Sequence, residues 1–140
     1  MDKIRIQRNV KRIEVNDNGE ILELDFDDLN LPYNFYAMIK KLETDRVKFT
    51  EELAENLKGK SDEESVDEMI AAERELNIYM RDAIDKVFGE GTCRKVYGDI
   101  LPSVEMHMQF FDALRPYFED ELKRRQQKMN KYSARRTGDV

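Results

Sequence analysis

Three long stretches of this sequence carry apolar residues at intervals of three and four, and this spacing decides what the chain can fold into. The first stripe runs over residues 35–57, the second over 66–87 and the third over 106–122. A recurrence near 3.6 residues places such side chains on one face of an α-helix. The absence of Trp, with only three Pro and six Gly, also favours long helices over a turn-rich all-β fold.

Capping residues delimit the first two helices. Asn30 precedes a proline in the first turn and is predicted to be the N-cap of the first helix, which ends near Gly59. Ser61 is followed three residues later by Glu64, which is the pattern of a capping box at the start of the second helix. The two helices are therefore predicted to be separated by only a short connection.

Glycines break the helical pattern after the second stripe. Gly89 and Gly91 are predicted to stop the second helix, because glycine readily adopts the left-handed conformation that ends helices. Residues 92–97 are predicted to form a short helix, capped by Thr92 and closed by Gly98. These breaks are interpreted as architectural, since they reverse the chain between two long helices.

A last long helix is predicted to start near Pro102. Pro116 lies inside it, and a proline there removes a backbone donor and should kink or split the helix. After Met129 the chain becomes basic and rich in small residues. We therefore expect a single domain over residues 1–129 and a flexible basic tail over residues 130–140.

Two short segments near the N-terminus alternate apolar and charged residues. They cover residues 10–15 and 20–26, and Asn18-Gly19 lies between them. Asn-Gly supplies the positive φ angles of a tight hairpin turn, so a two-stranded hairpin is predicted. The predicted fold class is α+β and mostly α, with an N-terminal β-hairpin followed by three main helices and one short helix.

Charge is segregated along the chain, whose net charge is −6. Residues 1–15 carry five bases and two acids, residues 16–30 carry six acids and no base, and residues 121–140 carry seven bases and two acids. One interpretation is that the basic ends solubilise the chain or fold back on its acidic middle. The alternative is that the basic C-terminal segment binds an acidic partner. A negative net charge disfavours nucleic acid as a partner.

Several features predict a cytoplasmic protein without a membrane segment. Cys93 is the only cysteine, so no internal disulfide can form. The N-terminus lacks the apolar core of a secretory signal, and no apolar run approaches the roughly 18 residues that span a bilayer.

The residues that usually carry chemistry are scarce. His107 is the only histidine, and it falls at helical spacing with Phe110, Phe111 and Leu114, which favours a partly buried or interface histidine over a catalytic one. One Cys and one His do not make a zinc site without unusual carboxylate ligands. The sequence therefore predicts a protein that is not an enzyme, with no catalytic, cofactor-binding or metal-binding residues.

Three stretches resemble a known family. They are FGEGTCRKVYGD at residues 88–99, FFDALRPYFEDELKRR at residues 110–125 and KYSARR at residues 131–136, following a charged hairpin, a long helix and an acidic helix. In this order the features resemble the tail assembly chaperones of long non-contractile-tailed phages and prophages of Gram-positive bacteria. The resemblance implies a helical protein of the bacterial host cytoplasm that has no cofactor and forms homo-oligomers.

The resemblance also implies a partner, the tape measure protein, which such chaperones keep soluble before the tail tube polymerises. The major tail protein is a second candidate partner. The candidate contact residues are apolar or basic: Phe110, Phe111, Phe118, Met69, Met80, Lys123, Arg124, Arg125, Arg135 and Arg136. Phe110 and Phe118 also fit a monomer core, whereas Phe111 points about 100° away from Phe110 on a helix and is the better surface candidate. The alternative function is a small helical DNA-binding regulator or anti-repressor of a mobile element.

Overall fold

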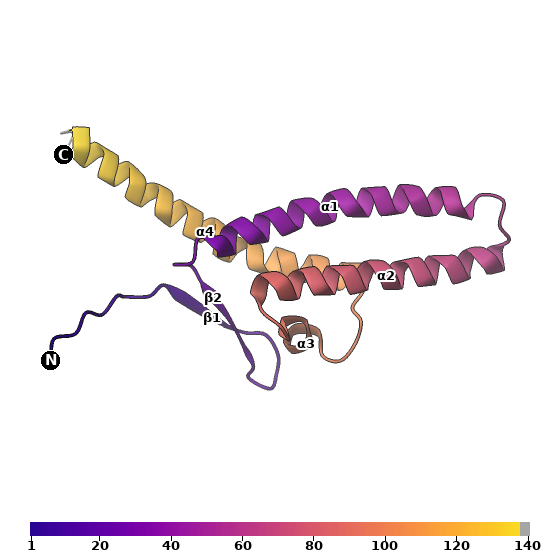
Figure 1. The fold of residues 1–140 in the computed structure, drawn as a ribbon, viewed down its shortest axis with the longest axis horizontal. Helices are drawn as coiled ribbons and strands as arrows, with labels where there is room; N and C mark the ends of the chain where they lie inside the picture. Colours follow the sequence, from indigo (N-terminus) through magenta and orange to yellow (C-terminus); the bar gives the residue numbers. More distant parts are fainter. Residues whose placement is uncertain (138–140) are drawn as a thin grey trace. The chain divides into compact units, whose positions relative to one another are not determined.

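The computed structural model of the chain describes residues 1–137 and confirms the predicted fold class (Figure 1). An N-terminal hairpin is followed by three long helices and one short helix among these residues. The elements are β1 (Val10–Glu14), β2 (Ile21–Asp25), α1 (Asn30–Leu57), α2 (Asp62–Phe88), α3 (Thr92–Tyr97) and α4 (Val104–Thr137). The chain divides into two compact units, of which the first, Met1–Ser103, holds the hairpin and α1–α3, and the second begins at Val104 with α4.

The hairpin is antiparallel, with Val10 opposite Asp25 and Glu14 opposite Ile21. Side chains alternate across it: Leu22 and Leu24 are buried, whereas Glu23 between them is exposed. This alternation follows from the two-residue period of a strand, which sends successive side chains to opposite faces. One face of the hairpin therefore belongs to the core and the other faces solvent.

The turn of the hairpin is wider than Asn18-Gly19 predicted. Gly19 has a positive φ of 76°, but no non-glycine residue among those described does, so Asn18 does not adopt the left-handed conformation. The side-chain oxygen of Asn16 instead accepts hydrogen bonds from the backbone N–H groups of Asn18 (2.9 Å) and Glu20 (3.2 Å). A short polar side chain that bonds its own backbone makes this loop and replaces the two-residue turn.

α1 and α2 form an antiparallel helical hairpin, with the two helices side by side (Figure 1). The core of this unit takes its helical residues from the N-terminal part of α1 and the C-terminal part of α2. The buried apolar residues of the two helices are Phe35, Met38, Ile39, Leu42, Leu76, Met80 and Ile84. The rings of Phe35 and Phe88 meet edge to face with their centroids 6.0 Å apart, and they join the two helices at this end.

One of the predicted N-caps is confirmed. The hydroxyl oxygen of Ser61 accepts a hydrogen bond from the backbone N–H of Glu64 at 3.2 Å, as the capping pattern requires. The prediction for Asn30 is wrong, because Asn30 is already the first residue of α1 and Leu29 occupies the cap position. The carboxylate of Asp28 takes over part of the role, accepting from the N–H of Asn30 at 2.9 Å.

α3 begins one residue earlier than a Thr92 cap would place it. The cap position belongs to Gly91, whose φ of 85° is left-handed, and Thr92 is the first helical residue. The Thr92 hydroxyl donates back to the carbonyl of Gly89 at 2.8 Å. Gly98 closes the helix as predicted, with a φ of 80° and its N–H bonded to the carbonyl of Arg94 at 2.8 Å.

α4 is a single helix that runs through Pro116 and past Met129 to Thr137. Pro116 does not split it. Proline removes the bond to the carbonyl of Asp112, and both residues are exposed, so water can satisfy that carbonyl. The predicted tail begins inside α4, since residues 130–137 are helical, and residues 138–140 lie outside the described residues. No helix in the described part is long and apolar enough to cross a membrane.

Candidate functional site

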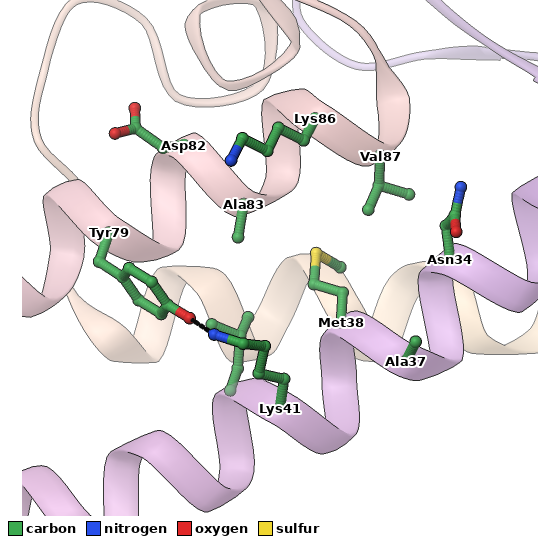
Figure 2. Close-up of a pocket in the computed structure, with 10 residues that line it drawn as sticks. Asn34, Ala37, Met38, Lys41, Tyr79, Asp82, Ala83, Lys86 and Val87 are labelled. Atoms are coloured by element: carbon green, nitrogen blue, oxygen red, sulfur yellow. Dashed lines mark hydrogen bonds between the residues drawn. The ribbon is translucent and has the colours of Figure 1, made fainter.

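A groove lies between α1 and α2 on one side of their hairpin (Figure 2). Its volume is about 550 Å³, and α1 and α2 supply all of its lining residues. Met38 and Leu42 of α1 and Ala83 and Val87 of α2 give it an apolar floor. The charged rim consists of Lys41, Asp82 and Lys86.

A second hollow of about 420 Å³ continues this groove toward the far end of the hairpin. The two hollows adjoin, because Lys41 and Tyr79 line both. Together they extend along α1 from Asn34 to Glu52, a helical rise of about 27 Å at 1.5 Å per residue. We call the two hollows together the α1–α2 groove.

Lys41, Asp45 and Tyr79 form a polar cluster across the middle of the groove. The Tyr79 hydroxyl donates to the Asp45 carboxylate at 2.7 Å, and the Lys41 ammonium donates to the same oxygen at 3.2 Å. Lys41 also donates to the Tyr79 hydroxyl oxygen (Figure 2) and lies 4.9 Å from the centre of the Tyr79 ring. This cluster ties α1 to α2 and sets a fixed pair of opposite charges in the groove.

The hydrogen bonds within this cluster shift two pKa values. The Tyr79 hydroxyl, followed by the Lys41 ammonium, lowers the pKa of Asp45 below its ordinary value. The Tyr79 oxygen and the Asp45 carboxylate raise the pKa of Lys41. Both shifts favour the charged forms, so Asp45 and Lys41 stay ionised over a wider pH range than isolated side chains.

The predicted phenylalanines are not surface residues. Phe110, Phe111 and Phe118 are only 8%, 2% and 0% exposed. The prediction that Phe111 faces a partner is therefore wrong, and the rings of Phe110 and Phe111 lie with their centroids 6.3 Å apart. A helix whose apolar stripe is wider than one residue buries both members of an adjacent aromatic pair.

The two predicted methionines differ from each other. Met80 is 2% exposed and belongs to the core, whereas Met69 is 49% exposed. Met69 therefore remains a candidate contact residue, but it is not among the residues that line the α1–α2 groove.

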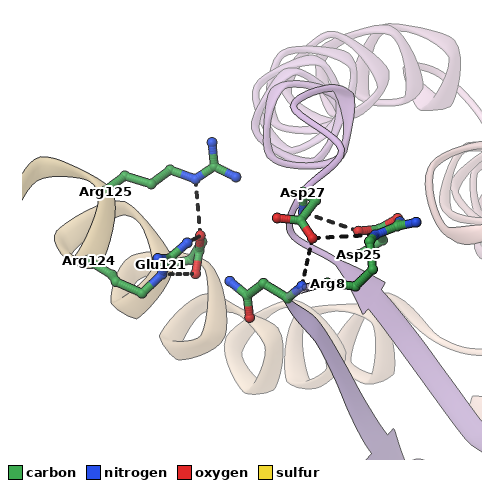
Figure 3. A network of polar contacts seen from close by, with 7 residues as sticks. Arg8, Asp25, Asp27, Glu121, Arg124 and Arg125 are labelled. Carbon is green, nitrogen blue, oxygen red and sulfur yellow. Dashed lines mark hydrogen bonds and ion pairs between the residues drawn. The ribbon is translucent and has the colours of Figure 1, made fainter. Parts of the chain in front are cut away.

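The five predicted basic residues of α4 also divide into two groups. Arg124 and Arg125 are half-buried and bind the carboxylate of Glu121 at 2.6 and 3.1 Å (Figure 3). Lys123, Arg135 and Arg136 are exposed. Because Glu121 is only 7% exposed, its two arginines neutralise a buried charge, and the exposed group is the better candidate for a partner contact.

His107 and Cys93 lie in the interior. His107 is fully buried, whereas the sequence predicted a partly buried or interface position, and its ring stacks on Phe111 with a centroid distance of 6.5 Å. Burial, and then the carboxylate of Asp85, raise the pKa of the Cys93 thiol to about 12. The thiol is therefore protonated at neutral pH and is not the thiolate that nucleophilic or metal chemistry needs. Among residues 1–137, no group of three or more His, Cys, Asp or Glu side chains could hold a metal ion.

Residues 18–139 match the family described as "Family of unknown function (DUF6673)". The chain belongs to this DUF6673 family. No curated protein and no solved structure matches the chain. The DUF6673 match takes in β2 and all four helices described here, and therefore the whole α1–α2 groove, whereas β1 precedes it.

Proposed function

We propose that this DUF6673 protein is a tail assembly chaperone that binds a helical segment of a tape measure protein in the α1–α2 groove. The observation that carries the proposal is the groove itself, which combines an apolar floor with a charged rim. Its length of about 27 Å accommodates about five turns of a partner helix. The resemblance of the sequence to tail assembly chaperones supports the choice of partner.

The physical basis is the recognition of an amphipathic helix by an apolar groove. A tape measure protein that has not yet been assembled exposes apolar helical stripes, which would otherwise aggregate. Such a stripe can bury its anchors against Met38 and Ala83 while its polar residues meet Lys41, Asp82 and Lys86 at the rim. Binding must stay modest, because the tail tube has to displace the chaperone.

The proposed contact surface differs from the one that the sequence predicted. The phenylalanines of α4 are buried, so the proposed contact residues are instead those of α1 and α2 that line the groove. Exposed Lys123, Arg135 and Arg136 retain a secondary role, since a basic segment speeds the encounter with an acidic partner.

The test is co-expression with a tape measure protein from the same genome. Ala37 is exposed and lines the groove, so Ala37→Glu places a charge and added bulk in the site without disturbing a buried residue. Ala54→Glu makes the same change at an exposed position of α1 that does not line the groove, and it serves as the matched control.

We expect the wild type and Ala54→Glu to raise the soluble yield of the tape measure protein and to co-purify with it. Ala37→Glu should do both less well while keeping its circular dichroism spectrum and melting temperature. The proposal is wrong if the wild type neither binds the tape measure protein nor changes its solubility.

A further inference from the structure

The first nine residues form an N-terminal arm with the pattern of a β-strand. Ile4 and Ile6 alternate with Lys3 and Arg5, and this two-residue period is typical of a strand with one apolar face. The structure assigns no strand to residues 1–9, and Ile4 and Ile6 are 94% and 80% exposed. The arm therefore has a strand sequence without a strand partner.

The arm extends beyond the end of its own hairpin. The ladder of β1 and β2 continues to Asn9, whose carbonyl accepts from the N–H of Phe26 at 3.0 Å. One residue earlier, Arg8 makes ion pairs with Asp25 and Asp27 (Figure 3). The chain then turns into α1 at Asn30, so β2 offers no residue opposite the first seven.

β2 has an open edge. Among residues 1–137 it pairs only with β1. The ladder bonds Phe26 N–H to Asn9 and Val15 N–H to Glu20, so the backbone groups of Ile21, Glu23 and Asp25 point away from β1. Of these, the Asp25 carbonyl already accepts from the N–H of Asp28 at 3.2 Å. The Lys95 ammonium reaches the carbonyl of Ile21 at 3.4 Å, but no strand covers this edge within the described chain. Such an edge accepts an added strand.

We propose that the N-terminal arm of one copy of this chain pairs with the open β2 edge of a second copy. The strands run antiparallel, with Arg5 of the arm opposite Glu23. In this register Lys3 stands opposite Asp25 on the solvent face. Ile4 and Ile6 stand opposite Leu24 and Leu22 on the face where β2 is buried.

The charges favour this register over the alternatives. Residues 16–30 carry six acids and no base, and the arm supplies cations to them. Glu23 already binds Arg12 of β1 through one oxygen at 3.0 Å, which leaves its second oxygen for Arg5. Two arms paired with each other about Arg5 would place like charges opposite, which destabilises a strand pair. A parallel register would set Lys3 against Ile21 and lose its ion pair.

The arrangement also explains why the occupant is a second copy. Asn9 holds the arm on the β1 side of the hairpin, so the arm of the same chain would have to pass around the end of β2 where α1 begins. A second copy reaches the edge without this detour. Because each copy gives one arm and receives another, the exchange closes a symmetric dimer.

Sedimentation equilibrium over a range of concentrations tests the proposal. The full chain should show a mass of about two protomers of 16.6 kDa at high concentration. Ile4→Asp/Ile6→Asp should shift it to a single protomer, while the control Ile4→Val/Ile6→Val, which keeps the β-forming apolar face, should still dimerise. Because both isoleucines are exposed in the single chain, all three proteins should melt at the same temperature at concentrations low enough for each to be monomeric, whereas the two that dimerise should melt higher at high concentration. A wild type that is monomeric throughout, or an aspartate variant that dimerises as strongly as the wild type, overturns the proposal.

Crosslinking tests the register separately. An Arg5→Cys chain and a Glu23→Cys chain, mixed and oxidised, should form a disulfide-linked dimer of the two. The native Cys93 does not compete because it is buried. Neither chain alone should crosslink to the same extent. If a chain carrying both substitutions crosslinks only within itself at high concentration, the arm covers its own β2 and the second copy is excluded.

Discussion

The two halves of the α1–α2 hairpin carry similar apolar stripes but differ in burial. Near the β-hairpin, Phe35, Leu42, Met80 and Ile84 are at most 5% exposed. Toward the connection between the helices, the large apolar residues Val47, Val66, Met69 and Ile70 are 49–62% exposed. We call these the near half and the far half.

This difference shows that a periodic pattern of apolar residues identifies the face of a helix that is suited to burial. The pattern does not show whether another element packs against that face. The near half has further elements of its unit beside it: α3 contacts α2, and the loop of the β-hairpin reaches α3 through a 2.9 Å hydrogen bond from Asn16 to the carbonyl of Lys95. The far half consists of two helices only, and two helices bury just the seam along which they meet.

The largest expected effect contrasts two methionines of α2. Met80→Ala removes a side chain that is 2% exposed and should cost about 2–5 kcal/mol of unfolding free energy. Met69→Ala changes a side chain that is 49% exposed and should cost less than about 1 kcal/mol. Urea denaturation measures both, and equal losses would remove the distinction between the halves.

An intermediate effect is expected from the cap of α2. Ser61→Ala removes the bond to the N–H of Glu64 and should cost about 1 kcal/mol. Ser65→Ala makes the same change inside the helix, where alanine has the higher propensity, and should cost nothing. Because the far half has little support, amide hydrogen exchange in the first turn of α2 should increase more than the global stability falls. Unchanged exchange there would mean that the far half unfolds only with the near half.

The smallest effect is expected at the boundary between the halves, where Tyr79 bridges Lys41 and Asp45. Tyr79→Phe should lower the melting temperature slightly at neutral pH. Since the pKa of Asp45 is lowered from 3.8, its share of the stabilisation is present above that value and is lost as the pH falls through the lower folded pKa. Since the pKa of Lys41 is raised from 10.5, its share is lost as the pH rises through the higher folded pKa. The difference in melting temperature between the two proteins should therefore shrink toward acid pH, where only the Lys41 share remains, and toward alkaline pH, where only the Asp45 share remains. A difference that does not change with pH would contradict this account.

Local signals in the sequence predicted the elements but not all of their boundaries. The N-cap at Ser61 and the helix end at Gly98 were predicted correctly, because no neighbouring residue takes over the terminal position there. At Asn30 and Thr92 a neighbouring residue took the cap position instead. Several adjacent residues can close a helix, and the backbone path of the connection selects among them.

The candidate site was less accessible to sequence reasoning. Met38 and Ala83 lie within the apolar stripes predicted over residues 35–57 and 66–87, but Lys41, Asp45 and Tyr79 gave no signal of their own. The hydroxyl of Tyr79 meets a carboxylate 34 residues away because of the register between two helices, and no local pattern encodes that register. The predicted surface at Phe111 was wrong for a related reason, since the stripe shows an apolar face without showing its cover.

The sequence by itself determined the α+β class, the order of the elements and the glycines at which the chain reverses, because these depend on interactions between residues close along the chain. Only the tertiary structure decided which half of each stripe is buried, which methionine remains exposed and where α1 and α2 leave a groove. Burial and groove shape depend on tertiary contacts between segments that are distant in the sequence. A periodic pattern of apolar side chains is compatible with many different sets of such contacts.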